Sequence, residues 1–242
     1  MIERVLGKNI QCVLHKNKAI ILLGARQTGK TTLLKQLFGN QSNTLWLNAD
    51  DADVQSLFAN ATSTSLRAII GNYATIVIDE AQRIENVGLK LKLITDQIPN
   101  VQLVATGSSA FELSNRINEP LTGRKWEFQL FPLSFAEMVA HNGLFEEKRL
   151  LRHRLLYGCY PEVVVNQGNE QGVLRQLSDS YLYKDILQWE GIQKPDRLLT
   201  LLKALAFQIG NQVSYNELAQ TCGLDSKTVE KYIFTITASV MP

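Results

Sequence analysis

Short apolar runs alternate with amphipathic stretches through the first half of the chain. The clearest runs cover residues 19–23, 44–47, 75–78 and 101–105, and a weaker alternating run follows at 126–130. Nearly continuous aliphatic and β-branched runs are typical of strands buried on both faces of a parallel sheet. Helical spacing lies between the runs, as at residues 31–38 and 89–97. The alternation predicts an α/β fold with a doubly wound parallel sheet.

The pattern changes after Pro132, which ends the fifth run. From there the apolar positions follow helical spacing, with a loop at residues 158–162. The predicted helices cover residues 135–141, 145–156, 173–189 and 196–209. The change of pattern places domain boundaries near residues 131 and 211.

Composition and charge exclude several classes of protein. The 242 residues carry 25 Lys and Arg against 23 Asp and Glu, a net charge of +2, so the molecule as a whole has no polyanion-binding character. Three scattered cysteines, Cys12, Cys159 and Cys222, have no metal-ligand or redox spacing and favour a reducing compartment. No signal peptide or membrane-spanning run is visible. We therefore expect a cytoplasmic protein with no membrane partner.

A phosphate-binding loop follows the first strand directly. The stretch GARQTGKT at residues 24–31 fits G-x-x-x-x-G-K-[ST] at every fixed position. Such glycines let successive N–H groups point at phosphate oxygens, Lys30 supplies charge to the β- and γ-phosphates, and the Thr31 hydroxyl is suited to Mg²⁺. The alternative is a glycine-rich turn with an exposed lysine. We predict that the phosphates contact Gly24, Ala25, Arg26, Gln27, Thr28, Gly29, Lys30, Thr31 and Thr32.

Two carboxylates end the third strand. Packing gives no reason for Asp79 and Glu80 to follow the apolar run at residues 75–78. At the carboxyl edge of a parallel sheet, Asp79 would hold Mg²⁺ and Glu80 would act as general base on the attacking water. The alternative is the start of a solvated loop. No guanine-reading Asn-Lys-x-Asp motif is present, which argues against a GTPase, and a small-molecule kinase has less need of Glu80.

The fourth strand turns abruptly polar at residues 106–109. Thr106 or Ser108 is placed to sense the γ-phosphate through a hydrogen bond. A plain helix cap by Ser108 or Ser109 explains the same residues equally well.

An arginine precedes the fifth strand. Arg124, in Leu-Thr-Gly-Arg, is a candidate arginine finger for the nucleotide of a neighbouring subunit, which would make it catalytic together with Lys30 and Glu80. Pairing with a surface carboxylate is the alternative.

These motifs together resemble the AAA-type predicted ATPases of bacteria and archaea. The resemblance rests on GARQTGKTTLL, IVIDEAQRI, LVATGSSAFEL, LTGRKWEFQLFPLSFAEM, YGCYPEVV and YLYKDIL, in that order. It implies a P-loop NTPase sheet of order 5-1-4-3-2, a helical lid, and ATP with Mg²⁺ as ligands. It also implies a sensor role for residues 106–109, a Mg²⁺ ligand at Asp79, a base at Glu80 and a motif arginine at Arg124.

The resemblance suggests three parts and two departures. The parts are an ATPase core at residues 1–131, a helical lid at 132–210 and a helix-turn-helix at 211–242. Cys159 stands where the relatives usually have the second glycine of Gly-Gly-Tyr-Pro. The relatives usually continue into a domain of unknown function, which we expect to be absent here, leaving a partial winged helix.

The helix-turn-helix reading rests on residues 213–233. Ser214 and Glu217 have the spacing of a capping box, Gly223 suits the turn, and a second helix opens at Ser226. In a major groove, Ser226, Lys227 and Thr228 would approach bases and Lys231 a phosphate. Asp225 and Glu230 weaken that electrostatic footprint, so a scaffold contacting another protein or domain is the favoured alternative.

The sequence therefore predicts Mg²⁺-dependent ATP binding and hydrolysis that drives a conformational switch. The alternative is a slowly hydrolysing, nucleotide-gated module that recruits DNA or a protein through its last segment. A kinase transferring phosphate to a small acceptor is a third reading. A homo-oligomer is compatible with the candidate arginine finger.

Overall fold

The computed structural model describes residues 2–39, 41–107, 117, 120–181 and 195–240. The chain divides into two compact units, residues 1–174 and residues 175–242, which are described separately below. The three-part division expected from the sequence stays a prediction.

The first unit is built on a five-stranded parallel sheet. Its strands are β1 (Ala19–Leu23), β2 (Thr44–Asn48), β3 (Thr75–Asp79), β4 (Gln102–Gly107) and β5 (Lys125–Gln129). Their order is β2-β3-β4-β1-β5, with every neighbouring pair parallel. Read from the other end, this is 5-1-4-3-2, so the predicted fold class and strand order are confirmed.

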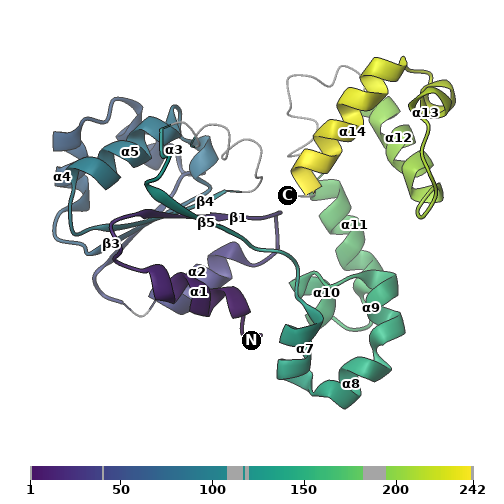
Figure 1. Cartoon of the computed structure of the whole chain (residues 1–242), viewed down its shortest axis with the longest axis horizontal. Helices are drawn as coiled ribbons and strands as arrows, with labels where there is room; N and C mark the ends of the chain where they lie inside the picture. The colour runs from purple at the N-terminus through teal and green to yellow at the C-terminus, as the bar shows by residue number, and fades with distance from the viewer. Residues whose placement is uncertain (1, 40, 108–116, 118–119, 182–194, 241–242) are drawn as a thin grey trace. The chain divides into compact units, whose positions relative to one another are not determined.

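Helices cover both faces of the sheet (Figure 1). One face carries α1 (Val5–Val13) and α2 (Lys30–Phe38), and the other carries α3 (Ala52–Ala59), α4 (Ser63–Ile70) and α5 (Val87–Gln97). All five residues of β1 are buried, because alternate side chains enter the two cores. Ile20 and Leu22 pack with α1 and α2, and Ile21 packs with the opposite helices. This two-sided burial explains the continuous apolar runs of the sequence.

The strand register gathers the polar strand ends at one edge of the sheet. Leu23, the last residue of β1, lies opposite Gly107 of β4, and Asn48 lies opposite Asp79 at the end of β3. Because all strands are parallel, the last residues of β1, β3 and β4 lie at the same carboxyl edge of the sheet. This places the loop after β1 beside the carboxylates after β3.

Short helices follow the sheet in the first unit. They are α7 (Phe135–Asn142), α8 (Leu144–Arg149), α9 (Leu151–Tyr157), α10 (Pro161–Val165) and α11 (Glu170–Tyr181), the last of which continues into the second unit. The helix predicted over 145–156 is instead two helices, interrupted at Leu150, whose ψ of −1° departs from helical values. The predicted end of the next helix, at residues 182–189, lies outside the described residues.

The second unit contains α12 (Pro195–Phe207), α13 (Tyr215–Cys222) and α14 (Ser226–Val240). Their buried core contains Leu198, Leu201, Leu218, Ala219, Cys222, Val229 and Tyr232. Gly223 makes the turn between α13 and α14 in the left-handed region, with φ 61°. The capping box predicted at Ser214 is wrong, because its side chain makes no cap hydrogen bond. The next helix, α14, is capped by Asp225, whose carboxylate accepts a 2.9 Å hydrogen bond from the N–H of Thr228.

Candidate functional site

The candidate site begins with the loop between β1 and α2. Gly24 has no room for a side chain, because a Cβ there would overlap the backbone carbonyl oxygen of Leu130. At the other end, Gly29 has φ 94°, a left-handed conformation that glycine adopts without steric cost. Gln27 is exposed and also has a positive φ, 59°. The loop therefore curls tightly where the sequence motif requires it.

Polar side chains close this loop from within. Lys30 is buried, and its ammonium donates hydrogen bonds to the carbonyl oxygens of Gly24 (2.8 Å) and Ala25 (2.9 Å). The buried hydroxyl of Thr28 donates to the same Ala25 carbonyl, at 2.8 Å. The Lys30 ammonium therefore reaches back from α2 to the start of the loop and holds its positive charge there.

The carboxylate of Asp79 collects donors from three segments. The Thr31 hydroxyl, in the first turn of α2, donates to Oδ2 at 2.7 Å. The Thr106 hydroxyl, from β4, donates to Oδ1. The backbone N–H of Glu80 also faces Oδ1, at 3.2 Å. The structure therefore brings together the two residues expected to hold a metal, Thr31 and Asp79, with the expected sensor Thr106 on the far side.

Glu80 lies next to this cluster in an unusual backbone conformation. Its φ of 53° and ψ of 40° are left-handed, which is uncommon for a residue other than glycine. Its N–H donates 3.1 Å to Oγ1 of Thr106, and its Oε2 accepts 2.5 Å from Nε2 of Gln82. Strained backbone of this kind is concentrated at functional sites. The half-buried carboxylate is held at the carboxyl edge, beside Asp79.

Arg124 lies at the opposite edge of the sheet. Its carbonyl oxygen accepts a 2.9 Å hydrogen bond from the N–H of Ala19, the first residue of β1. The phosphate loop, in contrast, follows Leu23, the last residue of β1. Four residue steps of strand separate the two edges by about 13 Å. Its guanidinium pairs with Asp96 of α5, Nε to Oδ1, at 2.8 Å. The structure therefore does not bring Arg124 to the loop of its own chain.

The remaining predicted contacts have simpler placements. Arg26 is half-buried in the loop, and Thr32 is exposed one residue after Thr31. Ser108, predicted as a phosphate contact, lies outside the described residues.

Two residues near the site escaped the sequence reasoning. Gln82 follows Glu80 by two positions, and the spacing Asp-Glu-x-Gln is a signal that could have suggested it. Arg4 precedes α1, and its guanidinium donates 2.8 Å to the carbonyl oxygen of Thr28 in the loop. No local pattern indicates this contact, because 24 residues separate the partners.

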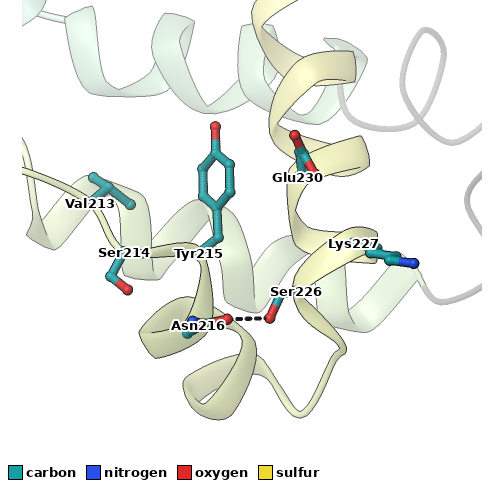
Figure 2. Close-up of a pocket in the computed structure, with 7 residues that line it drawn as sticks. All are labelled: Val213, Ser214, Tyr215, Asn216, Ser226, Lys227 and Glu230. Atoms are coloured by element: carbon teal, nitrogen blue, oxygen red, sulfur yellow. Dashed lines mark hydrogen bonds between the residues drawn. The ribbon is translucent and has the colours of Figure 1, made fainter.

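The second unit has an open pocket of about 320 Å³ between the starts of α13 and α14. Figure 2 shows its lining residues, with Ser226 hydrogen-bonded to Asn216 at 2.5 Å and Lys227 directed away from Tyr215. The Thr228 hydroxyl donates 2.6 Å to Asp225. Two of the three side chains expected to approach bases are thus engaged in holding the start of the helix, and DNA binding stays a prediction.

Two kinds of feature are absent from the described residues. No group of three or more His, Cys, Asp or Glu side chains is placed to hold a metal ion within the described ranges. Among the same residues, none of the helices has both the length and the apolar character that crossing a membrane requires.

Family models match almost the whole chain. A family described as "AAA domain" matches residues 16–139, just over half of the 242 residues. A family described as "Domain of unknown function (DUF8612)" matches residues 148–241. The expectation that a domain of unknown function is absent from this chain was therefore wrong.

Curated relatives and a solved structure also match most of this chain. An uncharacterized protein of Methanocaldococcus jannaschii is 22% identical over 89% of this chain and 52% of its own length. An uncharacterized protein of Haemophilus influenzae is 26% identical over 88% of this chain and 58% of its own. The chain thus spans about half the length of these relatives. A Walker-type ATPase of Pyrococcus abyssi has a similar fold, with TM-score 0.67 and 14% identity over 99% of this chain and 90% of its own.

Proposed function

The chain belongs to the AAA domain family and has the fold of a P-loop ATPase, and on that premise we propose that it binds and hydrolyses ATP with Mg²⁺. Hydrolysis would drive a conformational change between the sheet and the helical segment that follows it. The observation that carries the proposal is the 2.7 Å hydrogen bond between the Thr31 hydroxyl and Asp79 Oδ2. It joins the end of the phosphate loop to the end of β3.

The residues at this point fit Mg²⁺. A carboxylate and a hydroxyl are hard oxygen donors, and Mg²⁺ in nucleotide sites is held by few protein oxygens together with phosphates and water. Thr31 and Asp79 would hold the ion, and Thr106 would keep the carboxylate oriented through its other oxygen. Bound there, Mg²⁺ would neutralise charge on the β- and γ-phosphate oxygens.

The remaining roles follow from charge and position. Loop N–H groups and the buried Lys30 ammonium would bind the phosphates in place of the carbonyl contacts that Lys30 makes now. Glu80 would accept the proton of the attacking water, with Oε2 steadied by Gln82. The proposal includes Arg124 as an arginine finger that acts on the nucleotide bound by a neighbouring subunit.

A slowly hydrolysing binding module is the second candidate. The observation that favours it is the 2.5 Å bond from Gln82 to Glu80, because a carboxylate oxygen already bonded to a neighbour is less available to a water. Such a module would use ATP binding to control recruitment of a protein partner, or of DNA, through the second unit.

Phosphate release from Mg²⁺-ATP, measured per protomer over a wide range of protein concentration, tests the proposal. We expect release by the native chain and a fall in kcat of about 100-fold or more in Glu80→Gln, with ATP affinity kept. Lys30→Met should lose ATP binding. The matched control Glu85→Gln changes an exposed carboxylate on the same segment and should have no effect. ATP binding without release at any concentration would favour the binding module.

A further inference from the structure

One buried guanidinium touches three separate segments around the phosphate loop. Arg4 is only 8% exposed. Its Nη1 donates 2.8 Å to the Thr28 carbonyl, its Nη2 donates 2.5 Å to the Phe131 carbonyl after β5, and its Nε contacts Oε1 of Glu137 in α7 at 3.1 Å. The first turn of α7 and the start of α1 are thereby tied to the outer side of the loop.

The contact between Arg4 and the Thr28 carbonyl also orients the N–H of Gly29. The C=O of Thr28 and the N–H of Gly29 belong to one planar trans peptide and point in opposite directions. Holding the carbonyl against Arg4 therefore points the Gly29 N–H away from Arg4. Gly29 immediately precedes α2, where N–H groups bind phosphate in loops of this kind.

Glu137 keeps Arg4 in this position. Burial acts to raise the pKa of Glu137, but hydrogen bonds from the backbone N–H groups of Ser134 and Val5, together with the Arg4 charge, hold that pKa below its usual range. The carboxylate is thus ionised at neutral pH. A charged acceptor fixes an arginine more firmly than a neutral one.

We propose that Arg4 is a positioning residue that sets the Thr28–Gly29 peptide for phosphate binding, with Glu137 holding Arg4 in place. This rests on the proposed ATP binding. It goes beyond the loop motif, because Arg4 would contact no phosphate itself and would act through the loop backbone.

The test compares the native chain with Arg4→Met/Glu137→Gln and with Glu137→Gln alone. The double variant removes the Thr28 contact and leaves no buried charge unpaired, whereas Glu137→Gln keeps Arg4 and removes the charge that holds it. Affinities for Mg²⁺-ATP and for pyrophosphate are measured at a temperature where circular dichroism shows each variant fully folded. We expect the double variant to bind both probes about 10- to 100-fold more weakly than the native chain, as loss of a charged hydrogen bond predicts, with Glu137→Gln between the two. In turnover, KM should rise and kcat should change little.

A matched control lies next to Arg4, at the start of α1. Lys8 and Glu3 form an exposed pair at 3.4 Å, and Lys8→Met/Glu3→Gln should leave both affinities unchanged. Equal affinities for the double variant and the native chain would overturn the role of Arg4 and leave the proposed function standing. Failure of the native chain to bind either probe would overturn both.

Discussion

The Thr31 hydroxyl and the Asp79 carboxylate, 48 residues apart in sequence, meet at 2.7 Å where α2 begins and β3 ends. If this contact marks the Mg²⁺ position, a substitution here should weaken the part of the ATP affinity that depends on Mg²⁺ and leave metal-free ATP binding unchanged. We expect Asp79→Asn to bind ATP without Mg²⁺ about as well as the native chain and to lose most of the affinity that Mg²⁺ adds.

Titration with ATP in Mg²⁺ and in EDTA measures this difference. Asp50→Asn is the matched control, since Asp50 follows β2 and pairs with exposed Arg83 at 3.2 Å. Equal gains from Mg²⁺ in native chain and Asp79→Asn would remove Asp79 from the metal site.

Gln82 should affect the rate more than binding. Gln82→Met removes the donor to Glu80 Oε2 and keeps a side chain of similar size at a buried position. If Gln82 orients the base, kcat should fall about 10- to 100-fold with KM little changed, because small misplacement of a reacting group costs that much. Gln55→Met removes a comparable donor, to the Ala49 carbonyl rather than to Glu80, and should leave kcat unchanged. A rise in kcat would instead mean that Gln82 restrains Glu80.

Arg124 should contribute to ATP hydrolysis only when two copies of the chain associate. It lies at the amino edge of the sheet, so a catalytic contribution has to reach the nucleotide of another copy. We expect the specific rate of the native chain to climb with protein concentration and Arg124→Ala to abolish the climb. Asp96→Asn frees the same arginine from its partner without removing it, and should keep the climb. A rate independent of concentration in every variant would make the Arg124–Asp96 pair structural.

Glu147 and Arg154 form a buried pair outside the loop. Arg154 donates to both carboxylate oxygens, at 3.0 and 3.2 Å. These hydrogen bonds hold the pKa of Glu147 below its usual range despite burial. A lowered folded-state pKa adds stability above the unfolded value near 4.3, and this stability is lost as pH falls through the folded-state pKa.

Denaturant unfolding at several pH values tests this pair. At pH 7, Glu147→Gln should lower the free energy of unfolding by about 3 kcal/mol, because it leaves the guanidinium buried without its counter-charge. The gap from the native chain should narrow as pH falls below the unfolded value of about 4.3 and on through the lowered folded-state pKa of Glu147. Glu146→Gln, which breaks an exposed pair with Arg149, should change stability by less than about 1 kcal/mol.

Gly24 should not tolerate a methyl group. Because a Cβ at this position overlaps the Leu130 carbonyl, Gly24→Ala should cost about 1–3 kcal/mol in unfolding free energy and weaken ATP binding by shifting the loop. Gly7→Ala, within α1, meets only side-chain atoms at 3.4 Å or more and should be neutral or slightly stabilising. Thermal melting and ATP titration of the two variants decide the point.

Local patterns predicted the parallel sheet and the edge at which Asp79 meets the end of the phosphate loop. Two-sided burial leaves continuous apolar runs, and parallel strands bring their carboxyl ends together, so Thr31 and Asp79 could be paired from sequence. The break at Leu150 was missed because both short helices keep the same apolar spacing. The contact from Arg4 to Thr28 was missed because it depends on tertiary folding rather than on neighbours in the chain.

The position of Phe131 offers a practical handle on this protein. Its carbonyl takes part in the contact with Arg4, whereas its side chain is 55% exposed. The backbone contact survives any residue placed there, so Phe131→Cys would allow a fluorescent dye to be attached beside the loop. Exposed Cys12 and partly exposed Cys159 would first be replaced by serine to keep the labelling selective. Such a dye would report loop rearrangement in real time, without relying on turnover.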